Sequence, residues 1–431
     1  MPIDTEAKKE KVILVAVSER DGDDTADSVK ELGELAATAG ALVVGTVIQN
    51  REKIHPGTYV GTGKIDEIAE LLDIYNADGI ICDDELSPAQ MKNLGNILSC
   101  KIMDRTMVIL DIFAGRARTG EGKLQVELAQ LRYRLNHLTG MGREMSRLGG
   151  GIGTRGPGEK KLEMDRRLIR DRISILKSEL KDVVRHREIN RKQREKNHVP
   201  VAAIVGYTNA GKSTLLNALT GASVLSEDMV FATLDPTTRM LALDNKQEIL
   251  LTDTVGFIRK LPHHLIEAFK STLEEAKYAD IIIHVVDASN PEADKQMYIV
   301  YETLNNLGVE GKKIITLFNK WDLRRERLSC LTEEEKTTDE GLFFTNPIKD
   351  FRADKTLEIS AAKGEGLDEL KLELADFLRE DKVYVERVLP FDKAGLIQSI
   401  RKTGELLEET YEADGIHIKA YVTMETYGKL P

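Results

Sequence analysis

The sequence has little that would support a disulfide framework, a thiolate metal centre or a membrane span. Its 431 residues include three cysteines, Cys82, Cys100 and Cys330, which lie far apart and show no CxxC or Cys/His spacing. No apolar run approaches the roughly 18 to 20 residues that cross a bilayer, and the opening stretch MPIDTEAKKEK is too polar for a signal peptide. These absences argue against a secreted, disulfide-rich domain and a membrane span, and they indicate a cytosolic protein.

Positive charge is also scarce over most of the chain. The net charge is −11, yet residues 143–196 hold 17 Lys and Arg against 9 Asp and Glu, a local charge of +8 that leaves −19 on the remainder. A basic arm on an acidic body can contact polyphosphate at one place while its other faces are repelled. A solvated helical face explains the same charge equally well, so charge alone leaves both interpretations open.

Residues 1–115 predict a small parallel α/β domain. From residue 11 onward, short β-rich apolar runs such as KVILVAVSE and ALVVGTVIQN alternate with helical stretches. The motif TYVGTGK (58–64) would end a strand and open a helix, as an anion site does. It lacks the spacing of a phosphate loop, which favours a structural turn.

Two heptad-patterned stretches follow and predict an antiparallel helical hairpin over residues 116–198, joined by a glycine-rich loop at 140–158. Helices with matching apolar stripes bury them against each other, so the loop would project well clear of the rest of the chain. The first stripe comprises Leu124, Leu128, Leu131, Leu135 and Leu138, and the second comprises Ile169, Ile173, Leu176, Leu180 and Val183.

The predicted loop combines eight glycines with Arg143, Arg147 and Arg155, and it has no aromatic residue. Its formal GxGxxG at 151–156 follows a heptad-patterned helix, whereas a dinucleotide fingerprint follows a strand, so we interpret that match as a coincidence. A flexible basic loop suits insertion into a phosphate-rich cavity, which makes the three arginines candidate RNA contacts. A slack connector is the plainer alternative.

The most specific signal begins with the apolar run VAAIV and continues as GYTNAGKS, which fits GxxxxGK[ST] between a strand and a helix. The glycines let backbone N–H groups face phosphate oxygens, Lys212 neutralises the β- and γ-phosphates, and Ser213 offers a hydroxyl to Mg²⁺. The predicted phosphate-binding residues are Gly206, Tyr207, Thr208, Asn209, Ala210, Gly211, Lys212, Ser213 and Thr214.

Three further motifs follow at predicted strand ends. Within DTVG, Asp253 can hold Mg²⁺ through water and the Gly256 N–H can meet the γ-phosphate. Within NKWD, the Asp322 carboxylate can accept hydrogen bonds from guanine N1–H and N2–H₂, which adenine does not offer. The remaining predicted nucleotide contacts are Thr254, Val255, Asn319, Lys320, Ser360, Ala361 and Ala362.

These motifs resemble those of the translation-factor-related GTPases, and the whole chain is similar to HflX, a family of ribosome-associated GTPases. The similarity extends over PGTYVGTGK, GGGIGTRGPGE, GYTNAGKST, FATLDPTTR, DTVGF, NKWD and SAAKGEG. It implies an α/β multidomain chain, with a P-loop GTPase domain at 199–380 after the parallel domain and the hairpin, and a small α+β domain at 381–431. It also implies nucleotide contacts at Phe231, Ala232 and Thr233.

The resemblance assigns catalysis to Lys212, Thr233 and Gly256. Thr233 would coordinate Mg²⁺ together with Ser213 and Asp253, although Thr237 and Thr238 lie near enough in sequence to compete for that role. Phe257 stands where many small GTPases carry a glutamine that orients water, so we expect slow intrinsic hydrolysis.

Two weaker signals remain open or are disfavoured. Asn209 could help to bind a monovalent cation such as K⁺ or could be an ordinary turn residue. His263, His264 and Glu267 resemble a ligand cluster, but they fall beside the second switch and are disfavoured as a metal site. Residues 324–356 predict a polar, irregular surface insertion.

For function, the resemblance implies a GTP- and GDP-binding GTPase that uses Mg²⁺, contacts the large ribosomal subunit and its rRNA, and dissociates stalled or idle ribosomes. We expect a cytoplasmic monomer without a membrane span, with peripheral membrane association as a further expectation. A rival is a GTP-regulated switch that acts on a protein effector through the hairpin. An RNA-modification GTPase is a second rival, but the sequence offers no paired cysteines or cofactor motif for it.

Overall fold

The computed structural model describes residues 9–19, 24–148, 157–196, 199–221, 230–231, 234, 237–243, 245, 247–260, 262, 265, 275–380 and 382–431, with side chains masked at 139–148, 157–162, 190–196, 339–340 and 402. The chain forms two compact units. The first contains Met1–Val183 together with Met229–Leu234 and Arg259–Lys270, and the second contains the remainder. Two short segments of the predicted GTPase range therefore group with the N-terminal part of the chain.

The first unit is built on a four-stranded sheet in which every pairing is parallel. Its strand order, β2-β1-β3-β4, reverses direction between β1 and β3, and open α/β sheets bind ligands at such a point, beyond the carboxyl ends of the strands. The apolar, β-branched run of β1 is almost wholly buried, as a central parallel strand requires. The strands are β1 Lys11–Ser18, β2 Leu42–Asn50, β3 Gly79–Cys82 and β4 Lys101–Asp104.

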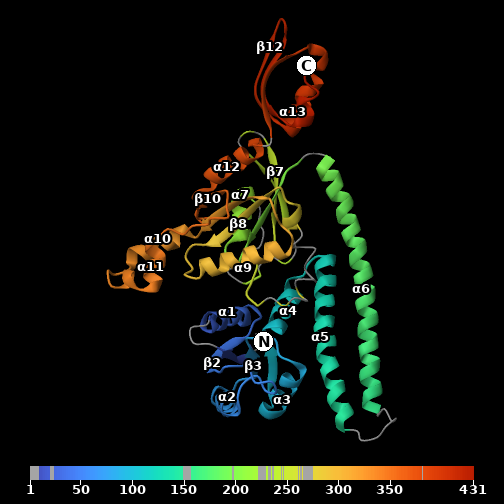
Figure 1. The fold of residues 1–431 in the computed structure, drawn as a ribbon, viewed down its shortest axis with the longest axis vertical. Helices are drawn as coiled ribbons and strands as arrows, with labels where there is room; N and C mark the ends of the chain where they lie inside the picture. The colour runs from blue at the N-terminus through green and yellow to red at the C-terminus, as the bar shows by residue number, and fades with distance from the viewer. Residues whose placement is uncertain are drawn as a thin grey trace, which may run out of the picture. The chain divides into compact units, whose positions relative to one another are not determined.

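Helices cover both faces of this sheet (Figure 1). Residues of α2 and α3, such as Ile68 and Leu94, share a core with Ile13 and Ile80, whereas α1 packs on Leu14 through Gly33. Strand β4 and helix α4 were not predicted, because a short apolar run does not distinguish a strand from a buried helix. The helices are α1 Thr25–Thr38, α2 Thr62–Tyr75, α3 Pro88–Leu98 and α4 Arg105–Arg116.

The motif TYVGTGK forms a tight turn, which the sequence had favoured over an anion site. An isolated bridge pairs His55 with Tyr59, whose φ is 67°, and α2 begins at Thr62. The preceding strand ends earlier than expected, at Asn50.

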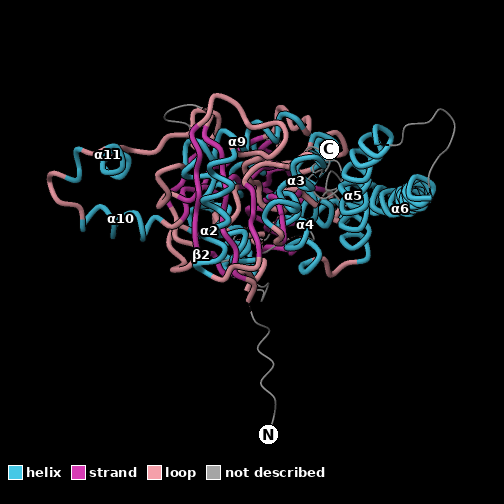
Figure 2. Tube along the Cα trace, turned by 90° about the horizontal axis from the view of Figure 1, so that it is seen from below, coloured by secondary structure: helices cyan, strands magenta, loops and turns pink. Residues whose placement is uncertain are grey.

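Helices α5 (Gly120–Leu148) and α6 (Pro157–Lys196) lie side by side and confirm the predicted hairpin (Figures 1 and 2). Leu128, Ile173 and Leu176 are buried between them. On the exposed side, Arg172 donates two hydrogen bonds to Glu127, at 2.7 and 2.9 Å. At a rise of 1.5 Å per residue, the helices reach about 44 and 60 Å.

The predicted loop at 140–158 was too long. Helix α5 continues to Leu148, which places Arg143 and Arg147 on the helix, and α6 begins at Pro157. Two internal glycines in 140–148 cost about 1 kcal/mol each relative to alanine, but the Met, Arg and Glu residues beside them are good helix formers. Arg155 lies outside the described residues.

The second unit contains a six-stranded sheet of order β10-β9-β8-β5-β7-β6, in which only the β6–β7 pairing is antiparallel among the described strands. Its central strands are apolar and buried, and α7 and α12 contribute Leu215 and Leu370 to the same core. The strands are β5 Val201–Gly206, β6 Thr237–Ala242, β7 Glu248–Asp253, β8 Ile281–Asp287, β9 Lys313–Asn319 and β10 Lys355–Glu358, and the helices are α7 Lys212–Thr220, α9 Ala293–Asn306 and α12 Leu367–Glu380.

The insertion between β9 and β10 is more ordered than the sequence suggested. It contains α10 (Trp321–Cys330), the 3₁₀ turn Glu335–Thr337 and α11 (Asp339–Thr345). The buried Arg324 guanidinium donates to the carbonyls of Ala288 and Asn346 and lies over the Phe343 ring. This single cation fixes the insertion to the sheet, a long-range contact that a polar local sequence does not reveal.

A buried polar group lies beneath the same insertion. The Asp350 carboxylate accepts hydrogen bonds from Thr316 Oγ1 at 2.6 Å and Tyr301 Oη at 2.7 Å, and it lies 3.7 Å from His284 Nδ1. Burial lowers the pKa of His284. Although burial opposes it, these hydrogen bonds hold the pKa of Asp350 well below its ordinary value.

The C-terminal residues form a small α+β module with an antiparallel sheet of order β11-β13-β12. Arg379 connects α12 to this module through two hydrogen bonds to Glu405, at 2.6 and 2.7 Å. With this module, the predicted fold class is confirmed. The elements are β11 Val383–Leu389, the 3₁₀ turn Phe391–Lys393, α13 Gly395–Thr403, β12 Glu405–Glu412, β13 Gly415–Val422 and α14 Met424–Tyr427.

Candidate nucleotide site

The turn between β5 and α7 has the backbone of a phosphate-binding loop. Gly206 has a φ of 155°, and a Cβ there would lie 2.3 Å from the Val285 carbonyl oxygen; at Gly211, with a φ of 94°, it would lie 2.3 Å from Asn319 Nδ2. Both positions therefore require glycine. Asn209 has a φ of 60°, a left-handed conformation that asparagine tolerates, so its place in the turn already explains its identity.

Lys212 and Ser213 begin α7 and are both buried. The Lys212 ammonium donates to the Tyr207 carbonyl oxygen at 2.7 Å. Burial lowers the pKa of Lys212 to about 8, against the opposing effect of Asp253. Ser213 Oγ donates to Asp253 Oδ2 at 2.8 Å, which brings together two oxygen groups that the sequence placed 40 residues apart.

The Asp253–Gly256 segment leaves the end of β7 and runs along the phosphate loop. The Phe257 N–H donates to the Gly206 carbonyl at 3.1 Å, and the Phe257 carbonyl accepts from the Thr208 N–H at 2.8 Å. A Cβ on Gly256 would lie 3.0 Å from Lys212 Nζ, so this glycine contacts the loop closely. The Phe257 side chain is only 2% exposed.

Asn319, at the end of β9, connects the phosphate loop to the Ser360–Ala362 turn. Its amide donates to the Ala210 carbonyl at 2.8 Å and accepts from the Ala361 N–H at 2.9 Å. Asp322 lies beside this turn, with Oδ2 at 3.1 Å from Lys363 Nζ. Although burial opposes it, hydrogen bonds from Ser360 and Lys363 hold the pKa of Asp322 below its ordinary value, so the carboxylate is an ionised acceptor.

The structure therefore gathers most of the predicted site residues at the carboxyl edge of one sheet. Lys320, another of the predicted nucleotide contacts, forms an ion pair with Asp287 at 2.7 Å. Asp287 was not among the predicted residues, although an acid at the end of the apolar strand β8 was the available signal.

The predicted switch residues are not all brought to this edge. Phe231 groups with the first unit, where its ring packs edge-on against Phe113 with centroids 4.6 Å apart. Thr238 lies in β6, and its hydroxyl shares a 3.0 Å hydrogen bond with Thr252. Outside the described residues lie Ala232, Thr233, His263, His264 and Glu267.

Known protein families match this chain over most of its length. Three family models match along the chain: "GTP-binding GTPase N-terminal" at 26–114, "GTP-binding GTPase Middle Region" at 116–194 and "50S ribosome-binding GTPase" at 201–320. The GTPase HflX of Lacrimispora saccharolytica is 62% identical over 98% of this chain and 96% of its own length. The chain belongs to the HflX family of GTPases. This membership confirms both the predicted family and the predicted GTPase activity.

Other similar proteins share less sequence identity with this chain. The GTPase HflX of Escherichia coli is 38% identical over 94% of this chain and 92% of its own. A GTP-binding protein from Sulfolobus solfataricus, solved in complex with GDP, is 25% identical, covers 85% of this chain and 98% of its own, and aligns with a TM-score of 0.44.

Among the described helices, none combines the length and the apolar character that a membrane crossing needs.

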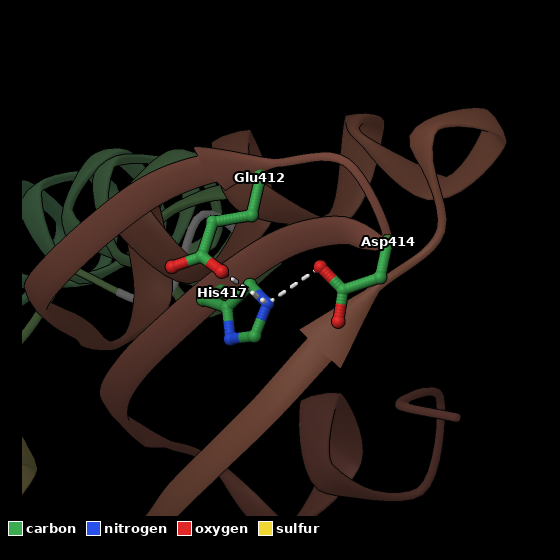
Figure 3. A group of neighbouring side chains, drawn as sticks. All are labelled: Glu412, Asp414 and His417. Atoms are coloured by element: carbon green, nitrogen blue, oxygen red, sulfur yellow. Dashed lines mark hydrogen bonds and ion pairs between the residues drawn. The ribbon is translucent and has the colours of Figure 1, made fainter.

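At the β12–β13 turn, His417 Nε2 lies 2.9 Å from Asp414 Oδ1 and 3.6 Å from Glu412 Oε2 (Figure 3). The hydrogen bond to Asp414 raises the pKa of His417, so the two groups form an ion pair across the turn once the ring is protonated.

Proposed function

We propose that this HflX-family GTPase is a GTP-gated factor that binds the large ribosomal subunit and dissociates stalled or idle ribosomes. One observation supports this most: the phosphate loop, the Asp253–Gly256 segment and the guanine-reading motif share one sheet edge, within residues that match a "50S ribosome-binding GTPase" family model. The same chain carries the long basic hairpin.

The phosphates of GTP would lie over the turn between β5 and α7. Lys212 would exchange its hydrogen bond with the Tyr207 carbonyl for phosphate oxygens, which offer it a stronger, charge-assisted partner. The Gly256 N–H would meet the γ-phosphate. The Asp322 carboxylate would accept from guanine N1–H and N2–H₂, and adenine would leave that acceptor unpaired.

Ser213 and Asp253 would hold Mg²⁺, with Thr233 as a further ligand. Hydroxyl and carboxylate oxygens are ligands that this hard cation accepts, and their separation of 2.8 Å would let both oxygens contact the same ion. When bound, Mg²⁺ would neutralise charge on the β- and γ-phosphates.

Hydrolysis would depend on help from outside the Asp253–Gly256 segment. The buried Phe257 side chain has no polar atom to orient the attacking water. A bound partner could reshape the switches, or K⁺ bound near Asn209 could stabilise the transition-state charge. Hydrolysis rates in K⁺ and in Na⁺ distinguish these routes, and equal rates would remove the K⁺ route.

The hairpin tip would be the RNA-contacting arm. Charge reversal of Arg143, Arg147 and Arg155 to Glu should abolish pelleting with purified large subunits in the presence of a non-hydrolysable GTP analogue. Nucleotide binding should be unchanged. The matched control reverses three exposed cations in the middle of α6, namely Lys177, Lys181 and Arg185.

Salt separates this function from a switch that docks a protein effector on the hairpin. Phosphate contacts weaken steeply as ionic strength rises, whereas an apolar helix contact does not. Pelleting with the large subunit should therefore fall sharply between 50 and about 200 mM salt. Undiminished pelleting of the tip variant would favour the effector switch.

A further inference from the structure

The C-terminal sheet has one face covered by a helix and one open face, and His417 lies on the open one. Strand β13 is the central strand, between β11 and β12. Its residues Ile416 and Ile418 are buried in a core that they share with α13. Because side chains alternate along a strand, His417 between them projects from the opposite face of the sheet.

Strand pairing brings two acidic residues to the same place. His417 lies opposite Thr410 of β12, and Glu412 follows two residues later on that strand, so both side chains belong to the open face. Asp414 lies in the short turn between Glu412 and its partner Gly415. The backbone register thus fixes the three positions independently of any contact between their side chains, as a preformed metal site requires.

The three side chains point toward one another (Figure 3). One ligand atom each from Glu412, Asp414 and His417 lies within 4.8 Å of the other two. Nitrogen and oxygen ligands that bind one zinc ion at about 2.0 to 2.2 Å lie roughly 3 to 3.6 Å from each other. The distances from His417 Nε2, 2.9 Å to Asp414 and 3.6 Å to Glu412, are close to that range. Small rotations of the side chains bring all three atoms into contact with one ion.

The charges and the chemistry of this group favour a divalent transition-metal ion. Within the described part of the chain, neither Glu412 nor Asp414 is paired with a lysine or an arginine, and both face the His417 ring. A protonated imidazole balances one of the two carboxylates, whereas a divalent cation balances both. Imidazole nitrogen is a ligand for zinc and its neighbours, while Ca²⁺ and Mg²⁺ take oxygen ligands.

We propose that Glu412, Asp414 and His417 form a binding site for a divalent transition-metal ion of the zinc type. The two acids are exposed, so water completes the coordination and one position stays open to exchange. The ion connects the end of β12 to β13 across the turn. Because it binds the folded hairpin, it stabilises the C-terminal module.

The test is a calorimetric titration of the full chain with Zn²⁺ in excess Mg²⁺, which fills sites made of oxygen ligands alone. The wild type should bind one more equivalent of Zn²⁺ than His417→Ala. Glu412→Gln should weaken that equivalent at least tenfold, since even the outer partners of metal ligands contribute about 10- to 100-fold. Equal stoichiometry and affinity in the wild type and in both variants would overturn the inference.

Two matched controls remove the same chemical groups elsewhere. His186→Ala replaces an exposed histidine on α6, and Glu386→Gln replaces an exposed acid of β11 on the same sheet face. Both should keep the full stoichiometry. Excess Ca²⁺ should not displace the Zn²⁺, and displacement would contradict the role of the imidazole.

Hydrogen exchange locates the ion and checks the fold of the variants. Zn²⁺ should slow exchange of the amides from Glu412 to His417 in the wild type and leave His417→Ala unaffected. Without Zn²⁺, the amides of β11 should exchange equally in both proteins, because the His417 side chain lies outside the core. Protection that appears only in other parts of the chain would refute the site. No nucleotide or ribosome takes part, so the proposed function stands or falls separately.

Discussion

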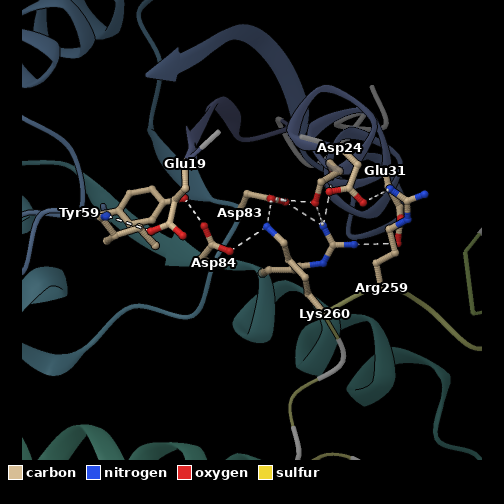
Figure 4. A network of polar contacts seen from close by, with 11 residues as sticks. Glu19, Asp24, Glu31, Tyr59, Asp83, Asp84, Arg259 and Lys260 are labelled. Atoms are coloured by element: carbon tan, nitrogen blue, oxygen red, sulfur yellow. Dashed lines mark hydrogen bonds and ion pairs between the residues drawn. The ribbon is translucent and has the colours of Figure 1, made fainter. Parts of the chain in front are cut away.

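The four-stranded sheet of the first unit and the six-stranded sheet of the second differ at their carboxyl edges. In the second unit, the edge is lined by glycine backbone and offers Lys212 to an anion. In the first unit, the edge carries Asp83 and Asp84, and Lys260 of the same chain fills it (Figure 4). Both sheets have an open carboxyl edge of the kind that binds ligands. Glycines and the sign of the charge distinguish the edge that suits a phosphate from the edge that a lysine of the same chain occupies.

The largest effect should come from replacing a glycine of the phosphate loop, which lines the carboxyl edge in the second unit. We expect Gly206→Ala to lower GTP affinity by at least about a hundredfold, because a Cβ would lie 2.3 Å from a backbone oxygen that cannot move freely. Isothermal titration with GTP measures the effect. Gly395→Ala, in the same unit with open space around its Cβ, is the control, and equal affinities for both variants would contradict the loop geometry.

The second-largest effect is expected at Asp322, the predicted hydrogen-bond acceptor for guanine. Asp322→Asn replaces one acceptor oxygen by a donor, so affinity for GTP should fall about a hundredfold while discrimination against ATP is lost. Competition binding with GTP and ATP measures both. Asp368→Asn, an exposed helix acid paired with Lys371, should change neither. Retained preference for GTP in the Asp322 variant would refute the assignment.

The ion pairs at the carboxyl edge of the first unit can be disrupted by replacing their buried cation, Arg105. Arg105→Met leaves Asp83 and Glu31 without their shared cation, and breaking a buried ion pair from one side costs about 3 to 5 kcal/mol. Hydrogen exchange of the amides in β3 and β4 should accelerate accordingly, while those in β8 keep their rates. Unchanged exchange in β3 would show that the network contributes little to stability.

A smaller effect should appear with pH in the second unit. Because burial lowers the pKa of His284 in the folded state, its unfolded form takes up a proton first as pH falls below the ordinary value of 6.5. Stability should therefore decline below that pH by up to about 1.4 kcal/mol per pH unit. The low pKa of Asp350 acts in the same direction, but only below about pH 4.

Urea unfolding at several pH values measures this slope. His284→Gln should flatten it between pH 6.5 and 5, whereas His186→Gln, at an exposed position on α6, should not. An identical slope in the His284 variant would assign the acid sensitivity to other groups.

The sequence predicted the parts of this molecule that local patterns encode. The apolar strands, the glycines of GYTNAGKS and the polar residues at strand ends all carry a signal within a few residues, and the leucine spacing predicted the hairpin. The predicted helix was shorter than α5, because the many glycines at 140–158 indicated a loop although the residues beside them are good helix formers. The Lys260 contact could not be predicted, since Arg259 and Lys260 look like surface residues and their partners lie about 176 to 235 positions away in sequence.

The most direct test of the proposed function is gradient centrifugation of intact ribosomes with this protein. With a non-hydrolysable GTP analogue, the ribosome peak should convert into separate subunits, and the protein should migrate with the large one. With GDP, the ribosomes should stay intact. Equal behaviour with both nucleotides, or intact ribosomes throughout, would contradict a GTP-gated splitting factor.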